Sequence, residues 1–268
     1  MNDRMMEYAL ITGASSGIGL EFARIAASNN MNLILLARNA EKMMKLREEL
    51  EELYSIKVLV VGCDLTKHDT VEKISGLLHS RGIVPEILIN NAGFGIHGPF
   101  ERIGYDSETN MIQVNITSLT ELTKVIYKQM RQKGRGKIIN VASVASFTPG
   151  PWMAVYHATK AYVLSFSEAL AAEAKGSGVT VTALCPGPTE TNFENRASTG
   201  AGMNAFKKFG KIPSAKEVAE YGWKAMKKGK RVAIHGRKFR WLLFFTRLLP
   251  RKTVVSIVGK IQKPAGSL

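Results

Sequence analysis

Three side chains in the middle of the chain stand at a spacing that suits proton transfer. Tyr156 and Lys160 are four residues apart in the stretch 154–175, which we expect to be helical, so their side chains share one helical face. A neighbouring ammonium group favours the phenolate and lowers a phenol pKa from its ordinary ~10, so that the phenol can exchange a proton with a substrate oxygen. Ser143 follows the expected strand 137–141 and could hydrogen-bond the same oxygen. The plainer alternative is a packed ring beside a lysine that reaches solvent.

A glycine-rich turn near the start of the chain suits a bound phosphate. The apolar stretch 7–12 predicts a strand and residues 20–28 predict a helix, with the sequence GASSGIG between them. Glycines allow a tight turn and a close approach to the backbone, and the first turn of a helix offers unpaired N–H groups and a favourable dipole. The alternative is an ordinary turn without a ligand. The expected dinucleotide site includes Gly13, Ser15, Ser16, Gly17, Ile18 and Gly19.

The residue after the second expected strand bears on the choice of cofactor. That strand covers 31–37, and Arg38 follows it directly. Many dinucleotide-binding folds have an acidic residue there for the ribose 2′-hydroxyl, whereas an arginine suits a 2′-phosphate. Arg38, joined by Ser15 of the glycine turn, therefore favours NADP(H) over NAD. A solvated arginine at a strand end is the alternative.

Two further expected strands end in polar or small residues. After 56–62 comes Asp64, which could bond the adenine or cap a helix that we expect to start near Lys67. After 83–89 comes the sequence NNAG, whose amides could hold neighbouring backbone while the Ala-Gly pair admits a ribose. The residues expected to contact the cofactor here are Asp64, Leu65, Asn91, Ala92 and Gly93.

Two later segments complete the expected site. Asn115 lies in a long expected helix, 106–132, on an otherwise apolar face. It makes either a plain helix–helix hydrogen bond or a local break that holds a water for proton relay from the lysine. The sixth expected strand, 179–184, ends in the sequence CPGPTET, where proline and glycine break the strand and threonines could bond an amide or a phosphate. From this turn we expect contributions from Pro186, Gly187, Thr189 and Thr191.

The order of these elements predicts the fold class. Six expected strands alternate with helices, and a short last strand follows at 231–234. This pattern predicts an α/β fold of about seven strands in a parallel sheet, with helices on both faces. The polar features at the strand ends lie where such sheets bind ligands. A length of 268 residues favours one domain, 1–268, over two.

Composition indicates a globular protein in a reducing compartment. Apolar residues make up 45% and charged residues 22% of the chain, which suits a chain that buries a full core. The two cysteines, Cys63 and Cys185, fall in apolar runs and indicate no disulfide framework. No metal site is indicated. We find no secretion signal and no apolar run of the ~18–20 residues that a membrane span needs, so we expect a cytoplasmic protein.

The net charge of +15 is concentrated at the end of the chain. From Arg196 onward there are eighteen Lys and Arg but only two Glu. Residues 188–212 read as a lid over the substrate, and Ser214 with Glu217 forms a capping box that opens a helix. The stretch 237–263 predicts basic amphipathic helices. Its aromatic and leucine residues between basic flanks suit peripheral contact with the inner membrane surface, a lid over an apolar pocket, or a subunit interface.

The motifs, in this order, resemble those of the short-chain dehydrogenase/reductase family. The resemblance implies a Rossmann-type, doubly wound sheet and hydride transfer between NAD(P) and an alcohol or carbonyl. It implies Tyr156 as general acid/base, Ser143 as the group that steadies the substrate oxygen, and Lys160 as the group that lowers the tyrosine pKa and holds the nicotinamide ribose. It also implies that Asn115 keeps the proton-relay water, and it favours a homodimer or homotetramer. The matching residues span roughly 5–195, the expected cofactor-binding and catalytic core, and are Thr12, Gly13, Gly17, Ile18, Gly19, Asn90, Asn91, Ala92, Gly93, Asn115, Ser143, Tyr156, Lys160, Pro186 and Gly187.

The sequence thus predicts an NADPH-dependent oxidoreductase that acts on a small carbonyl or alcohol substrate, an apolar ketone or a 3-oxoacyl compound. The main alternative is a dinucleotide-binding protein with an interaction or membrane-associated role and an idle active site. The intact set of Asn115, Ser143, Tyr156 and Lys160 argues against that alternative. Nucleic-acid binding ranks last, because no aromatic-interleaved basic patch or nucleic-acid motif accompanies the charge.

Overall fold

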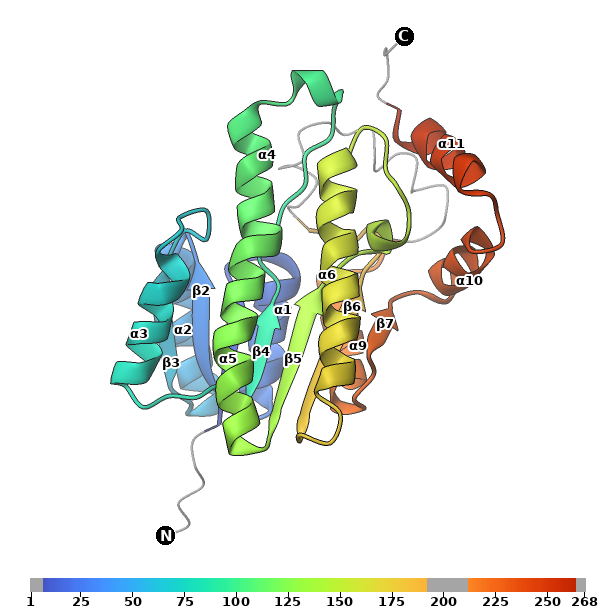
Figure 1. Ribbon diagram of the computed structural model, residues 1–268. Helices are drawn as coiled ribbons and strands as arrows, with labels where there is room; N and C mark the ends of the chain where they lie inside the picture. The colour runs from blue at the N-terminus through green and yellow to red at the C-terminus, as the bar shows by residue number, and fades with distance from the viewer. Residues whose placement is uncertain (1–6, 192–211, 264–268) are drawn as a thin grey trace.

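A seven-stranded parallel sheet forms the centre of the molecule. The structure, a computed structural model, describes residues 7–191 and 212–263 (Figure 1). The strands run in the order β3-β2-β1-β4-β5-β6-β7, and every neighbouring pair is parallel. This confirms the predicted fold class. The strand bounds are β1 Tyr8–Thr12, β2 Asn32–Ala37, β3 Val58–Gly62, β4 Ile87–Asn90, β5 Gly136–Val141, β6 Val179–Cys185 and β7 Val232–Ile234.

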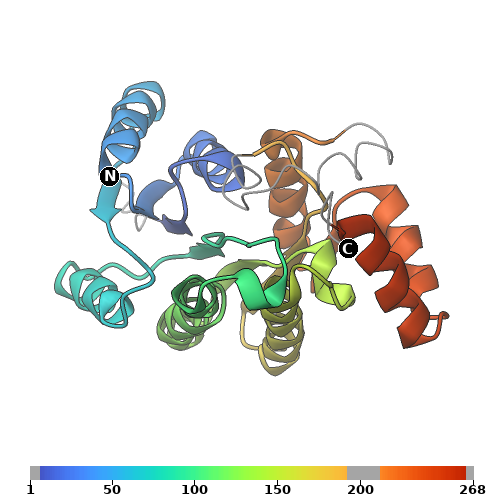
Figure 2. The same ribbon diagram turned by 90° about the horizontal axis from the view of Figure 1, so that it is seen from above.

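Helices cover both faces of the sheet, as Figure 2 shows from above. One face carries α1 (Gly17–Ser28), α2 (Ala40–Tyr54) and α9 (Ala215–Lys227), and the other carries α3 (Thr70–Ser80), α5 (Leu119–Lys133) and α6 (Ala154–Glu173). Each face has its own apolar core, which includes Phe22 and Trp223 on the first and Leu88 and Ile126 on the second. The strands are mainly apolar because helices cover both faces of the sheet.

The long helix expected at 106–132 is present, but it is not regular. It consists of α4 (Tyr105–Ile112), a π-helical segment at Gln113–Ser118, and α5. In Figure 1 these parts form one continuous rod in front of the sheet. A π-helical segment holds an extra residue per turn, and such segments are frequent at functional sites. Short 3₁₀ turns lie at Phe100–Arg102 and Val144–Phe147.

Several elements begin at residues other than those the sequence predicts, among them β4, α3 and α1. β4 begins at Ile87 rather than residue 83, because Pro85 has no N–H to donate to a ladder and pairing with β1 starts only where Glu86 N bonds Tyr8 O. α3 begins at Thr70 rather than near Lys67, because the chain first turns on itself through hydrogen bonds to the Asp64 carbonyl. α1 begins already at Gly17 rather than Leu20, so part of the glycine turn belongs to the helix.

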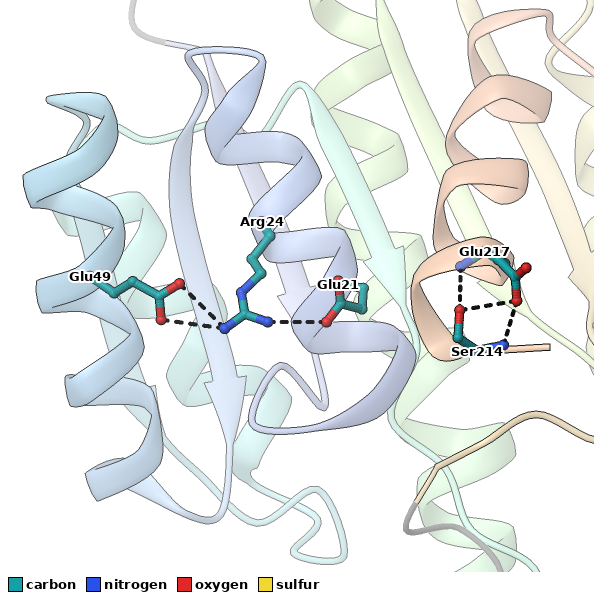
Figure 3. Close-up of polar contacts among 5 residues, drawn as sticks. All are labelled: Glu21, Arg24, Glu49, Ser214 and Glu217. Carbon is teal, nitrogen blue, oxygen red and sulfur yellow. Dashed lines mark hydrogen bonds and ion pairs between the residues drawn. The ribbon is translucent and has the colours of Figure 1, made fainter. Parts of the chain in front are cut away.

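Polar side-chain contacts link α1 to α2 and cap the start of α9, as Figure 3 shows. The Arg24 guanidinium on α1 lies 3.2 Å from a carboxylate oxygen of Glu21 and 3.3 Å from one of Glu49, so it joins α1 to α2. The predicted capping box at the start of α9 is confirmed. Glu217 N donates to Ser214 Oγ at 3.2 Å, and the Glu217 carboxylate accepts from Ser214 N at 2.7 Å.

Two helices form the C-terminal extension, α10 (Arg237–Thr246) and α11 (Arg251–Gln262). They lie beside the β7 end of the sheet, away from α2 and α3 (Figures 1 and 2). The predicted helical extension is therefore confirmed. No helix within 7–191 or 212–263 is both long and apolar enough to cross a bilayer. The expected lid, 188–212, falls mostly on residues 192–211, which lie outside the described part of the chain.

Candidate active site

A cavity of about 410 Å³ opens at the carboxyl ends of the strands. At the centre of the sheet β1 lies between β2 and β4, so the connections leave in opposite directions and a crevice forms there. Of the predicted residues, Gly19 and Asn115 lie outside the lining formed by the described part of the chain. The predicted residues that line the cavity are Gly13, Ser15, Ser16, Gly17, Ile18, Arg38, Asp64, Leu65, Asn91, Ala92, Gly93, Ser143, Tyr156, Lys160, Pro186, Gly187, Thr189 and Thr191.

The glycine turn presents backbone to the cavity. Gly13 and Gly17 have positive φ angles of 67° and 58°, a region that glycine enters at little cost. Since α1 begins at Gly17, its first unpaired N–H groups stand at the cavity wall. Gly19 has a different role, because a Cβ there would collide with Gly13 O and the Asn91 amide. It lets α1 pack against the turn, whereas Gly13 and Gly17 shape the surface that a phosphate would meet.

Asn91 ties the glycine turn to the end of β4. Its Nδ2 atom donates to Thr12 O at 3.0 Å and to Gly13 O at 3.3 Å. In return, Thr12 Oγ1 accepts from the backbone N of Asn91 and of Ala92, both at 2.9 Å. The expectation that a side-chain amide holds neighbouring backbone here is confirmed. These four hydrogen bonds fix the carboxyl ends of β1 and β4 relative to each other.

Arg38 and Asp64 stand at the same part of the cavity wall. Asp64 does not cap α3, whose N-cap is Asp69, so the capping alternative is wrong. Its Oδ1 atom accepts instead from Thr66 N at 3.0 Å. Although partial burial raises the Asp64 pKa, the hydrogen bonds from Thr66 and the charge of Arg38 together hold it below its ordinary value. A carboxylate and a guanidinium therefore both face the cavity from the ends of β3 and β2.

The turn after β6 closes the cavity opposite the glycine turn. Thr189 Oγ1 donates to Gly187 O at 2.9 Å, which stabilises the break that the sequence PGP makes in the strand. A Cβ on Gly17 would lie only 3.2 Å from Thr191 Cγ2. The two turns thus approach each other closely across the space where a phosphate would lie.

Ser143, Tyr156 and Lys160 converge on one wall of the cavity. Ser143 follows β5, its hydroxyl accepts from Ala145 N at 3.1 Å, and it hydrogen-bonds Tyr156. Lys160 Nζ donates to Val141 O at 2.9 Å and lies 5.9 Å from the centroid of the Tyr156 ring. Lys160 is only 4% exposed, so the alternative of a lysine that reaches solvent is wrong.

Burial sets the pKa values of this group, and it corrects one expectation. Burial raises the pKa of Tyr156 to about 12, although the hydrogen bond with Ser143 lowers it. Burial likewise lowers the pKa of Lys160 to about 8. The predicted lowering of the tyrosine pKa is therefore not found, because loss of hydration disfavours the phenolate more than its neighbours favour it. At neutral pH the phenol is protonated and can donate a hydrogen.

Asn115 holds the backbone beside the wall formed by Ser143, Tyr156 and Lys160, from a buried position in the π-helical segment. Its Oδ1 atom accepts from Phe94 N at 3.2 Å, and its Nδ2 atom donates to Phe94 O at 2.9 Å and to Thr159 Oγ1 at 3.0 Å. The bond to Thr159 is the expected helix–helix hydrogen bond, and the π-helical segment is the expected local break. The helix–helix hydrogen bond is therefore confirmed, while the water relay stays a prediction. A Cβ on Gly93 would lie 2.9 Å from Asn115 Oδ1 and 3.3 Å from Lys160 Nζ. Because glycine has no Cβ, the side chains of Asn115 and Lys160 can approach the backbone of residue 93 closely.

The cavity lining also includes residues that the sequence analysis did not single out, among them His97, His157 and Gln262. His157 Nδ1 lies 2.7 Å from Thr148 O, which can only accept, so Nδ1 carries the hydrogen and Nε2 accepts from Gln262 Nε2 at 3.0 Å. His97 Nε2 lies 2.6 Å from Gln262 O. The end of α11 therefore forms part of the cavity wall, which agrees with the lid interpretation of 237–263. No local pattern marks Gln262, since its partner His157 is 105 residues away.

Comparison with known proteins decides the family. A family model described as short chain dehydrogenase matches residues 7–202. The chain belongs to the short-chain dehydrogenase family. It is 34% identical over 184 residues to 17-beta-hydroxysteroid dehydrogenase type 3 of Mus musculus, which covers 68% of this chain and 60% of that protein. It is 31% identical over 191 residues to very-long-chain 3-oxoacyl-CoA reductase-A of Danio rerio, with 69% and 59% covered. The chain thus spans about 60% of the length of these relatives.

Solved structures of the family agree along most of the chain. A short-chain dehydrogenase from Sphingobium yanoikuyae in complex with NADPH superposes with a TM-score of 0.80 at 30% identity, over 90% of this chain and 93% of that one. A bulky-bulky ketone specific alcohol dehydrogenase from Comamonas testosteroni superposes with a TM-score of 0.76 at 28% identity, over 98% and 97%. The second superposition includes nearly the whole chain, so it reaches into the C-terminal extension.

Proposed function

We propose that the protein is an NADPH-dependent reductase of an apolar ketone or a 3-oxoacyl compound. The observation that carries this proposal is the meeting of two groups of residues in one cavity. Ser143, Tyr156 and Lys160 form one wall, and the glycine turn with Arg38 forms another. A cofactor held on the second wall would reach the first, which is the arrangement that hydride transfer with proton transfer requires.

The residues at the glycine turn fit the phosphates of a dinucleotide. The start of α1 offers unpaired N–H groups, and the positive φ angles of Gly13 and Gly17 expose backbone that a side chain would cover. Arg38 can pair with a 2′-phosphate, and Ser15 lies on the same cavity wall. In the relative from Sphingobium yanoikuyae the bound cofactor is NADPH. These features support NADP(H) as the cofactor.

The catalytic wall suits protonation of a carbonyl oxygen. Bound NADPH supplies the hydride that reduces the carbonyl carbon. Tyr156, protonated at neutral pH, donates a proton to the oxygen as negative charge develops there, and the Ser143 hydroxyl hydrogen-bonds the same oxygen. The Lys160 ammonium stabilises the phenolate that remains and holds the nicotinamide ribose. Asn115 keeps the water that returns a proton to this pair.

The cavity walls support an apolar substrate. Phe94, Val114 and Met153 line the cavity beside Tyr156. The relatives are, by name, a 17-beta-hydroxysteroid dehydrogenase and a very-long-chain 3-oxoacyl-CoA reductase, and a structural relative is specific for bulky ketones. Each of these names describes a carbonyl or alcohol on a large molecule, and the steroid and the very long acyl chain are apolar. We therefore propose a substrate of that class.

The organisation and location of the protein complete the proposal. We propose one domain, 1–268, with the cofactor-binding and catalytic core at 5–195 and basic helices at 237–263; the lid expected at 188–212 falls mostly on residues outside the described part of the chain. The protein acts in the cytoplasm as a homodimer or homotetramer. Size-exclusion chromatography with light scattering measures the assembly directly, and a monomeric mass would remove that part of the proposal.

Fluorescence titration with NADPH and NADH, followed by NADPH consumption with a panel of carbonyl compounds, tests the function. The panel contains bulky ketones, ketosteroids and 3-oxoacyl thioesters. We expect NADPH to bind at least about tenfold more tightly than NADH, because a hydrogen bond to a charged group contributes about 1.5–3 kcal/mol and about 1.4 kcal/mol is a factor of ten. We also expect at least one panel member to be reduced. Binding of NADPH without reduction of any compound would favour the alternative with an idle active site.

A further inference from the structure

The C-terminal extension presents apolar side chains to solvent in a dense group. On α10 and the turn after it, Trp241, Leu242, Phe244, Phe245, Leu248 and Leu249 are between 43% and 70% exposed. We call these six side chains the tail surface. The rings of Trp241, Phe244 and Phe245 lie with centroids 5.8–6.4 Å apart, so they form one patch. Single exposed apolar residues are normal, whereas a contiguous patch marks a surface that binds something.

Other residues of the extension hold the two helices against the body of the protein. Leu243 and Val254 are buried. The Phe239 ring packs on Gly187, since a Cβ added to Gly187 would lie only 2.6 Å from Phe239 Cε2. At the end of α11, Gln262 bonds His157 in the cavity wall. Since α10 already has a side that packs on the body, the tail surface is its second, outward side. It is therefore not the core-facing side of a helix that has been left unpacked.

The tail surface is framed by positive charge. Between Arg237 and Lys263 there are eight Lys and Arg and no Asp or Glu. Arg237, Lys238 and Arg240 precede these apolar residues, Arg247 lies among them, and Arg251 and Lys252 follow them, all exposed. An occupant of this surface must therefore offer apolar area and negative charge side by side.

We propose that the tail surface docks on a lipid bilayer that contains anionic lipids, with α10 lying in the plane of the interface. Acyl chains accept the aromatic and leucine side chains, and anionic headgroups pair with the flanking cations. A second copy of this chain fits less well, because a two-fold interface places the same patch on both sides and brings cations against cations. The docked helix would sit beside the cavity that α11 closes, so an apolar substrate could pass directly from the bilayer. That consequence rests on the proposed function, but the docking itself does not.

Vesicle co-sedimentation of the full-length protein tests the docking. The vesicles consist of phosphatidylcholine alone or of phosphatidylcholine mixed with phosphatidylglycerol. We expect binding to the anionic vesicles to be at least about tenfold stronger than to the neutral ones, and to weaken in about 1 M NaCl, where the screening length is ~3 Å. Equal binding to both vesicles, or no binding, would overturn the proposal. The result does not depend on turnover, so it stands apart from the test of the reductase.

Two double variants locate the contact. Trp241→Ser with Phe245→Ser should weaken binding to anionic vesicles at least about tenfold, because two large apolar side chains leave the interface. The matched control, Phe100→Ser with Tyr105→Ser, removes two exposed rings elsewhere and should bind as the unchanged protein does. Thermal melting checks that each variant folds. If the first variant retains vesicle binding, the tail surface does not contact lipid. The same conclusion follows if the unchanged protein does not bind vesicles and the first variant loses a dimer that light scattering detects in the unchanged protein.

Discussion

The charge of Lys160 should set an alkaline limit on reductase activity. The side chain is 4% exposed, and its Nζ atom donates to Val141 O at 2.9 Å. Burial disfavours the charged amine and lowers its pKa from 10.5 to about 8. The ammonium form, which stabilises the phenolate of Tyr156, is therefore present below pH 8 and is lost as the pH rises.

The size of the effect follows from the loss of a single proton. At one pH unit above the pKa, about a tenth of the enzyme carries the ammonium form, so kcat/KM should fall about tenfold for each further pH unit. Tyr156 adds no alkaline limit in this range, because its pKa of about 12 keeps the phenol protonated. An unburied lysine would keep its charge to a pH above ~10 and would give a flat profile.

The assay is kcat/KM for the ketone at saturating NADPH, measured from roughly pH 7 to 10, since this ratio reports the ionisable groups of the enzyme before the ketone binds. The matched control is Lys160→Arg, because a guanidinium keeps its charge throughout. We expect this variant to be slower but to show no alkaline decline. A profile of the unchanged enzyme that stays flat to pH 10, or a decline that survives in Lys160→Arg, would refute the reasoning.

Three further substitutions test separate parts of the site. Arg38→Asp should shift the ratio of kcat/KM values for NADPH and NADH toward NADH by about tenfold or more, since it repels a 2′-phosphate; an unchanged ratio would remove Arg38 from the cofactor site. Asn91→Leu leaves the carbonyls of Thr12 and Gly13 without their side-chain donor and should lower the free energy of unfolding in urea by about 1–3 kcal/mol; a midpoint equal to that of the unchanged protein would contradict this. Gln262→Leu removes the donor to His157 and should lower the same free energy by about 1 kcal/mol; an unchanged urea midpoint would show that this hydrogen bond does not stabilise the protein.

The sheet and most of the cavity lining could be predicted because their signals are local. An apolar run, a glycine turn and an amphipathic helix each occupy a few neighbouring residues, and the parallel sheet brings the strand ends together. Arg38 is an example, because the apolar run of β2 directly before it is enough to predict that it lies at the carboxyl end of the sheet. Boundaries were harder to predict, as at β4, where Pro85 delays pairing until Ile87.

Other features depend on contacts between distant residues and could not be read from a local pattern. Gln262 reaches the cavity only because the C-terminal extension packs beside the β7 end of the sheet (Figure 1), where Gln262 meets His97 and His157. The pKa of Tyr156 is a second example. Its spacing from Lys160 indicates a lowered value, but the loss of hydration depends on all the surrounding chain and raises it.

The central claim is that Tyr156 is the proton donor of a ketone reductase, and Tyr156→Phe tests it most directly. The substitution removes one hydroxyl from a buried ring and leaves the glycine turn and Arg38 in place. Single-turnover oxidation of bound NADPH by the best ketone of the panel should slow by about 10²-fold or more, the usual contribution of a general acid, while the Kd for NADPH changes less than about threefold. Turnover at a rate close to that of the unchanged enzyme would contradict the claim.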